Sequence, residues 1–177
     1  MMTARRLFVV PLGNNDHGKT TIINALLSQG LGAPSPERKG ARTLISPGGR
    51  RVNAYVFVRS YQETEKSAQK SVSAALKKND PDWKKRELII FPSHVSDSEG
   101  DIDEMILLAH QAGFDIISAA VLLDADRRSR LANIWEKPWD ERWTVPNMTQ
   151  DDEEIRGVQL HALGRDLWWR ICKTLVP

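Results

Sequence analysis

Residues 7–21 read Leu-Phe-Val-Val-Pro-Leu-Gly-Asn-Asn-Asp-His-Gly-Lys-Thr-Thr, an apolar run followed by a polar loop that begins and ends near glycines. The apolar run, 7–12, is continuous rather than alternating, which is typical of a strand buried on both faces of a parallel sheet. After Thr20 the chain favours a helix, because its apolar residues recur at helical spacing: Ile22, Ile23, Leu26 and Leu27. This stretch therefore predicts a strand, a loop and a helix, and with them an α/β fold.

The loop between strand and helix fits the spacing G-x-x-x-x-G-K-[ST] of a phosphate-binding loop at every fixed position. Gly13 and Gly18 allow the backbone to curl so that successive N–H groups face an anion, with the positive end of the helix behind them. We expect Lys19 to reach the β- and γ-phosphates and Thr20 to offer its hydroxyl to Mg²⁺. The residues predicted to contact a nucleotide here are Gly13, Asn14, Asn15, Asp16, His17, Gly18, Lys19, Thr20 and Thr21.

Length and composition favour one domain over residues 1–177, since 41% hydrophobic content in 177 residues suffices for one core. Lys and Arg number 25 against 23 Asp and Glu, so the net charge does not point to nucleic acid or a membrane. The single Cys172 excludes an internal disulfide. No stretch approaches the roughly 18 apolar residues of a membrane span. We expect a cytoplasmic protein, without a signal peptide because Pro11 breaks the first apolar run.

The rest of the chain alternates expected strands and helices. We predict a β-hairpin from strands at 42–46 and 52–60, joined by Pro47-Gly48-Gly49. Further strands are expected at 87–95, 114–123 and 143–146, with helices at 63–79, from a cap at Ser98 or Asp101 to Gly113, and at 152–175; residues 131–142 read as irregular. The order predicts a mostly parallel sheet covered by helices on both faces, with one antiparallel hairpin strand.

Two surface features have plain structural interpretations. The last helix is expected to bury a stripe of apolar residues along one side: Ile155, Val158, Leu163, Leu167, Ile171 and Leu175. The neighbouring Trp168 and Trp169 are expected to pack rather than to stack on bases. The basic excess between Lys66 and Arg86 favours a solvated face over a nucleic-acid surface.

The run Asp16-His17-Gly18-Lys19-Thr20-Thr21 resembles the D-H-G-K-T-T phosphate loop of the translation-factor GTPases, which are P-loop NTPases. Residues 37–43 are similar to the first switch of that family, which implies that Thr43 contacts Mg²⁺ and the γ-phosphate. The resemblance implies Mg²⁺-dependent binding of a purine nucleoside triphosphate, GTP or ATP. It also implies a switch that regulates a partner protein or a second copy of the chain.

The sequence departs from that family at two motifs. Arg59-Ser60-Tyr61-Gln62 stands where the family has D-x-x-G, and Leu123-Asp124-Ala125-Asp126 stands where it has N-K-x-D. Only Asp126 matches the second motif, as a carboxylate that would accept hydrogen bonds from a guanine edge. We therefore expect a degenerate switch with slow or absent hydrolysis.

Asp124 supports a second interpretation. It follows an apolar run, 116–123, in the manner of a strand that delivers a carboxylate to Mg²⁺ at the edge of a sheet. Arg127, with Arg128 and Arg130, would then stabilise the charge on a transferring phosphoryl group. Lys19, Asp124 and Arg127 are the catalytic candidates of such an ATP-dependent phosphotransferase or ATPase. A non-enzymatic adaptor that keeps the loop as a relic is the third interpretation.

The four histidines add little to these hypotheses. His94, at the end of the expected strand 87–95, is a weaker candidate to touch a substrate or to position water. His17 is expected to contact neighbouring backbone within the loop. His110 and His161 lack a second ligand one helical turn away, so no zinc site is predicted.

Overall fold

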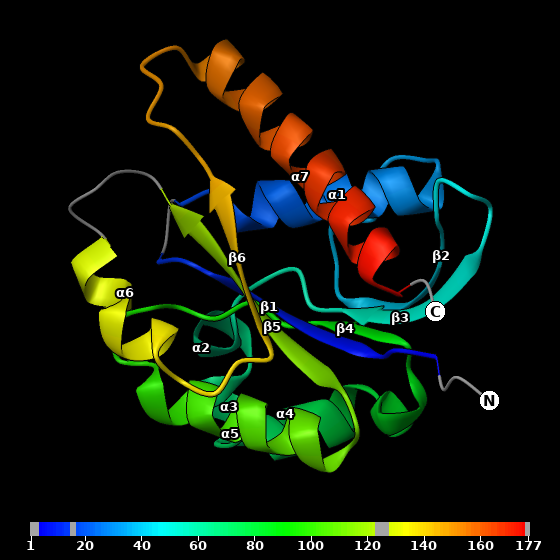
Figure 1. Cartoon of the computed structure of the whole chain (residues 1–177), viewed down its shortest axis with the longest axis vertical. Coiled ribbons are helices and arrows are strands. Elements are labelled where there is room, and N and C mark those ends of the chain that lie inside the picture. The colour runs from blue at the N-terminus through cyan, green and yellow to red at the C-terminus, as the bar shows by residue number, and fades with distance from the viewer. Residues whose placement is uncertain (1–3, 15–16, 123–127, 176–177) are drawn as a thin grey trace.

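The computed structural model describes residues 4–14, 17–122 and 128–175, of which 128–130 by their backbone only. A six-stranded sheet runs through the molecule in the order β2-β3-β4-β1-β5-β6 (Figure 1). Its strands are β1 (Leu7–Leu12), β2 (Gly40–Ile45), β3 (Arg51–Val56), β4 (Leu88–Ile90), β5 (Asp115–Leu122) and β6 (Glu141–Pro146). Neighbouring strands are parallel except at the β2 edge, where β2 and β3 form the antiparallel hairpin. The predicted sheet, mostly parallel with one antiparallel strand, is confirmed.

Helices cover both faces of the sheet (Figure 1). On one face lie α1 (Lys19–Leu31) and α7 (Glu153–Leu175). The other face carries α2 (Tyr61–Thr64), α3 (Lys66–Gln69), α4 (Val72–Asn79), α5 (Glu99–Gln111) and α6 (Arg128–Trp135). Because successive side chains of a strand point to opposite faces, β1 contributes Leu7 and Val9 to one core and Phe8 and Val10 to the other. This explains why its apolar run is continuous.

The two helices of the first face touch through backbone. A Cβ atom at Gly164 of α7 would lie 2.4 Å from the carbonyl oxygen of Ile22 and 2.6 Å from the Cβ of Ala25, both in α1. No side chain fits at this crossing. Gly164 therefore sets how closely α7 lies against α1.

The buried stripe of α7 differs from the prediction in its first turns. Ile155 is 54% exposed and Val158 is 68% exposed, whereas the buried residues begin only at Leu160. Figure 1 shows the first turns of α7 reaching beyond the carboxyl end of β6, where the sheet offers no surface to pack against. Farther along, Trp168 is buried and Trp169 is 48% exposed, so the packing interpretation holds for the first of the two.

The single helix predicted over 63–79 is instead three short ones, α2, α3 and α4. Lys70 adopts a left-handed conformation, with φ at 62°, and separates α3 from α4. Ser71 then caps α4, because its side chain accepts a hydrogen bond from the backbone N–H of Ala74 at 3.1 Å. At the earlier break, the buried Glu65 side chain accepts hydrogen bonds from Lys39 and from Asn79, at 2.9 Å for the latter.

Two further expectations were wrong in extent. The strand predicted over 87–95 ends at Ile90, and Pro92, which has no N–H to donate, follows shortly after it. Residues 131–142, expected to be irregular, include most of α6, whose Leu131 and Ile134 are buried. Among the described helices, none combines the length and the apolar character needed to cross a membrane.

Candidate functional site

The 13–18 loop joins β1 to α1 and depends on its two glycines. Gly18, directly before α1, has φ at 85°, a conformation that glycine adopts without the penalty of a side chain. At Gly13 a Cβ atom would lie only 3.0 Å from Nδ1 of His17. Both glycines of the spacing are therefore needed by the shape of the loop itself.

His17 lies against the loop backbone, as expected. Its Nδ1 accepts a hydrogen bond from the backbone N–H of Asn14 at 3.0 Å, and its own backbone N–H donates to the Asn14 carbonyl at 3.3 Å. Its carbonyl accepts a hydrogen bond from the side chain of Asn147 at 2.8 Å, and Asn147 in turn accepts one from Gln159 of α7 at 2.7 Å. The loop is thus linked to α7. Asn15 and Asp16, both predicted to bind the nucleotide, lie outside the described residues.

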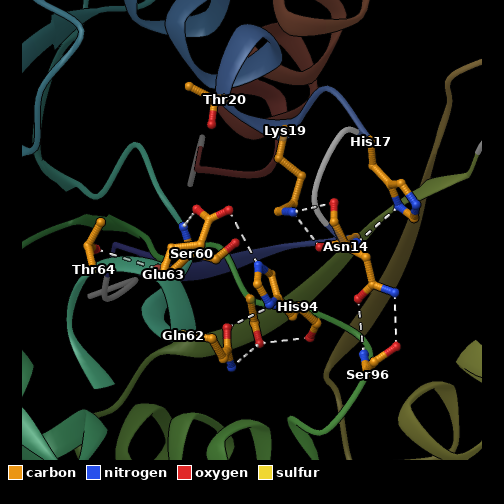
Figure 2. A network of polar contacts seen from close by, with 12 residues as sticks. Asn14, His17, Lys19, Thr20, Ser60, Gln62, Glu63, Thr64, His94 and Ser96 are labelled. Atoms are coloured by element: carbon orange, nitrogen blue, oxygen red, sulfur yellow. Dashed lines mark hydrogen bonds and ion pairs between the residues drawn. The ribbon is translucent and has the colours of Figure 1, made fainter. Parts of the chain in front are cut away.

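Asn14 connects the other side of the loop to the segment between β4 and α5. Its side-chain oxygen accepts hydrogen bonds from the backbone N–H groups of Val95 and Ser96, at 3.0 and 3.1 Å, and its side-chain nitrogen donates to the Ser96 hydroxyl at 2.9 Å (Figure 2). The side chain of Asn14 thereby connects the 13–18 loop to the segment that contains Val95 and Ser96. The loop is held from both sides, by Asn14 and by Asn147.

Lys19 turns back over the loop that precedes it. Its side chain is buried, and its Nζ donates hydrogen bonds to the carbonyl oxygens of Gly13 and Asn14, at 2.9 Å for the latter (Figure 2). The ammonium group therefore lies against the backbone of the loop. A phosphate oxygen bound at this place would compete with these carbonyls for the donors of Nζ.

A polar pocket of about 480 Å³ opens beside the loop, and we refer to it as the loop pocket. Five segments contribute to its wall: the loop, the start of α1, the β3–α2 connection, α2 and α7. Its lining residues are Asn14, His17, Gly18, Lys19, Thr20, Thr21, Arg59, Glu63, Arg156 and Leu160. Lys19, Arg59 and Arg156 bring three cationic side chains to one pocket. Such a concentration of positive charge suits an anionic ligand.

An acidic side chain and an imidazole face Lys19 and Thr20 from the far side of this space (Figure 2). Glu63 lies in the first turn of α2, where one carboxylate oxygen accepts a hydrogen bond from the backbone N–H of Ser60 at 3.1 Å. Its other oxygen lies 3.4 Å from Nε2 of His94. The backbone N–H of His94 donates to the side chain of Gln62 at 2.9 Å.

The structure separates the predicted metal ligands. Thr20 lines the loop pocket, and its hydroxyl makes a long contact of 3.5 Å with the Val58 carbonyl. Thr43 does not reach the pocket, because it lies within the antiparallel edge strand β2, exposed and opposite Asn53. Among the described residues, no group of three or more His, Cys, Asp or Glu side chains is placed to hold a metal ion.

The remaining predicted site residues, Asp124, Asp126 and Arg127, lie outside the described residues. Arg128 and Arg130 belong to the start of α6, where only the backbone is described. The strand that leads to them, β5, pairs with β1 over residues Asp115 to Ala120. The carboxyl end of β5 therefore lies next to the carboxyl end of β1, which the 13–18 loop follows.

Sequence reasoning missed several residues of the loop pocket, namely Arg59, Glu63, Arg156 and Leu160. For Glu63 a signal exists, because Ser60 and Glu63 have the S-x-x-E spacing of a capping box that marks the start of a helix. The sequence also did not reveal that β4 lies between β3 and β1 in the sheet. Ser93, beyond β4, forms a bridge with Leu12 at the start of the loop.

Comparisons with known proteins leave the function to be argued from the pocket. No model of a known protein family matches the chain, and no curated protein sequence matches it. A de novo designed protein solved by NMR is 12% identical over 89% of this chain and 88% of its own, with a TM-score of 0.41. The crystal structure of APE1195 is 15% identical over 94% of this chain and 99% of its own, with a TM-score of 0.40.

Proposed function

We propose that this protein is a P-loop nucleotide-binding protein that holds a purine nucleoside triphosphate, GTP or ATP, in the loop pocket. The observation that carries the proposal is that Gly18, Lys19 and Thr20, three of the four fixed residues of the phosphate-loop spacing, line one polar pocket with two arginines from distant segments. A triphosphate is strongly anionic, and Lys19, Arg59 and Arg156 supply matching charge. A pocket of about 480 Å³ also lies in the usual range for small-molecule sites.

Mg²⁺ would accompany the nucleotide, and the chain offers an oxygen ligand for it. Mg²⁺ in nucleotide sites keeps several waters and takes one or two protein oxygens besides the phosphates. The Thr20 hydroxyl fits this requirement, since it lines the loop pocket with a long contact to Val58. When bound, the ion neutralises part of the phosphate charge. Asp124, if it reaches this edge, would be a further ligand.

The proposed role is that of a switch that regulates a protein partner or a second copy of the chain, with slow or absent hydrolysis. Slow hydrolysis is expected because Arg59-Ser60-Tyr61-Gln62 replaces D-x-x-G. Two sets of hydrogen bonds connect the loop beside the pocket to other elements. Asn14 bonds to Ser96, ahead of α5, and Asn147 bonds to His17 and Gln159, the latter in α7.

The test is a titration of fluorescent ATP and GTP analogues with and without Mg²⁺. We expect one of the two to bind the wild-type protein, more tightly with Mg²⁺ present. Lys19→Ala should weaken binding about 10- to 100-fold, because a hydrogen bond to a charged group contributes about 1.5–3 kcal/mol. Lys77→Ala, which removes an exposed lysine of α4, is the matched control and should leave binding unchanged. Absence of binding to the wild-type protein contradicts the proposal.

One observation favours a second candidate, an ATP-dependent phosphotransferase or ATPase that uses Asp124 and the arginines after it. This function needs the strand before Asp124 to adjoin the strand before the phosphate loop, and β5 does pair with β1. We expect Asp124→Asn to abolish turnover without changing the melting temperature if this candidate is right. A variant with full turnover would rule it out.

A further inference from the structure

We propose that Glu63 is the catalytic base of a slow nucleoside triphosphate hydrolysis in the loop pocket, an inference that rests on the proposed nucleotide binding. Glu63 is the acidic residue among the described lining of this pocket. It enters from α2, whereas Lys19 and Thr20 enter from α1 on the opposite side (Figure 2). A phosphate chain held at Lys19 would therefore have the Glu63 carboxylate across from it.

One oxygen of this carboxylate accepts a hydrogen bond, and the other lies near an imidazole nitrogen. The backbone N–H of Ser60 fixes one at 3.1 Å, and Nε2 of His94 approaches the other at 3.4 Å. His94 is a positioning residue, and Nε2 is out of contact with solvent and forms no hydrogen bond with any described residue. Its nearest charged neighbour is Glu63. A base held this way is aligned before the substrate arrives.

A second amide, the side chain of Gln62, holds the segment around His94 in place. Gln62 accepts a hydrogen bond from the backbone N–H of His94 at 2.9 Å. Its side-chain nitrogen donates to the Ser93 hydroxyl and to Asp101 of α5, each at 3.0 Å. The residues around Glu63 thus form one network from α2 through the β4–α5 segment to α5. Figure 2 shows Glu63, Gln62 and His94 within it. A carboxylate held in such a network is better placed for a catalytic role than a carboxylate that is exposed to solvent.

The proposed step conserves atoms and electrons. The oxygen of a water molecule bonds to the γ-phosphorus, while the bond from that phosphorus to the β–γ bridging oxygen breaks. One water proton passes to the Glu63 carboxylate, and the electron pair of the broken bond stays on the nucleoside diphosphate. The products are the diphosphate and inorganic phosphate, and Glu63 then releases its proton to solvent. Arg59, which also lines the pocket, is placed to stabilise charge on the phosphate oxygens.

A purely structural role for Glu63 as the cap of α2 is the alternative, and Glu63→Gln separates the two. The amide oxygen of glutamine still accepts the hydrogen bond from Ser60, but the amide cannot take a proton. Glu63→Asp retains a base on a shorter side chain and moves it away from the phosphate. Glu99→Gln removes a carboxylate from the first turn of another helix, α5, and serves as the matched control.

The experiment measures two quantities for each full-length variant with Mg²⁺: the affinity for fluorescent ATP or GTP, and phosphate release in a single turnover. We expect Glu63→Gln to bind within about threefold of wild type and to release phosphate about 100-fold or more slowly. Glu63→Asp should also be slowed, since a displacement of about 1 Å can cost about 100-fold. Glu99→Gln should match wild type in both.

Three results would overturn the inference. Phosphate release by Glu63→Gln at more than a third of the wild-type rate shows that no proton passes to this carboxylate. Tight binding by wild type with release no faster than in Lys19→Ala removes the reaction while leaving nucleotide binding intact. Failure of wild type to bind either nucleotide overturns the proposed function itself, and with it this inference.

Discussion

Gly18 bends the chain where the 13–18 loop meets α1, and two independent constraints act on it. Its φ of 85° lies in the left-handed region, and a Cβ atom would approach Cδ2 of Leu160 to 2.6 Å. Gly32, which ends α1, shares the first constraint with φ at 65° but has nothing within 4 Å of a Cβ position. The pair therefore separates backbone strain from side-chain crowding.

We expect Gly18→Ala to lower the free energy of unfolding more than Gly32→Ala does. The left-handed conformation costs an alanine roughly 1–2 kcal/mol at either site, which lowers Tm by about 2–8 °C in a chain of this size. The contact with Leu160 adds to this only in Gly18→Ala. Thermal unfolding followed by circular dichroism measures the difference. Equal losses in the two variants would show that Leu160 yields freely.

Cys172 gives the stability a dependence on alkaline pH. Burial in the α7 core raises the pKa of its thiol from about 9 to about 11, against an opposing effect of the Arg50 charge. The folded state therefore keeps the thiol proton while the unfolded chain releases it between these values. Stability from this group is fully present below pH 9 and is lost as the pH rises toward 11.

The expected loss between pH 9 and pH 11 is on the order of 2 kcal/mol for this thiol. Urea unfolding of wild type and of Cys172→Ala at both pH values measures it. Other groups titrate in both proteins, so the difference between the two losses isolates the thiol. An identical pH dependence in Cys172→Ala would contradict the raised pKa.

Between elements, the crossing of α1 and α7 depends on the absence of one methyl group. We expect Gly164→Ala to destabilise the protein by about 1–3 kcal/mol, because its Cβ would meet the Ile22 carbonyl at 2.4 Å and the rigid helices must separate. Gly157→Ala, on the same helix with nothing within 4 Å, is the matched control. It should instead stabilise α7 by up to about 1 kcal/mol. Chemical denaturation of both variants checks the opposite signs.

Elements with strong local signals could be predicted from the sequence, and those shaped by distant contacts could not. The strand at 7–12 and the hairpin at Pro47-Gly48-Gly49 can each be predicted from the residues within that segment. By contrast, the break at Lys70 occurs in a stretch without Gly or Pro. At the earlier break, the buried Glu65 accepts hydrogen bonds from a lysine directly before β2 and from an asparagine of α4. The exposure of Ile155 depends on where the sheet ends, which no helical periodicity records.

The same distinction applies to the candidate site. Local spacing located Gly13, Gly18 and Lys19, because the loop is continuous in sequence and makes its own contacts. Arg59 and Arg156 come from the β3–α2 connection and from α7, and only the assembled sheet brings them to the loop. Placing β4 between β3 and β1 is likewise a property of the whole topology. No local sequence pattern around these two arginines indicates that they line the loop pocket.

At the scale of the whole molecule, one sheet supports two hydrophobic cores, and the loop pocket opens beside the loop that follows the central strand β1. A ligand bound there stabilises the folded state alone. At a nucleotide concentration of 100 times its Kd, the gain is about 2.7 kcal/mol. We expect a rise in Tm of roughly 5–11 °C for wild type, measured by thermal unfolding with Mg²⁺ present. Lys19→Ala should lose most of this rise.

α7 also gives the molecule a mechanical connection. Its 23 residues extend about 34 Å at 1.5 Å per residue, from the loop pocket to the opposite end of the sheet. Near its start, Gln159 is connected to His17 by hydrogen bonds through Asn147, and farther along Gly164 packs against α1. Beyond Gly164 the residues Leu167, Trp168, Ile171 and Leu175 are buried, so the core holds the far half of α7 in place. The helix therefore anchors the loop to the core, and a shift of the loop would meet the resistance of that packing.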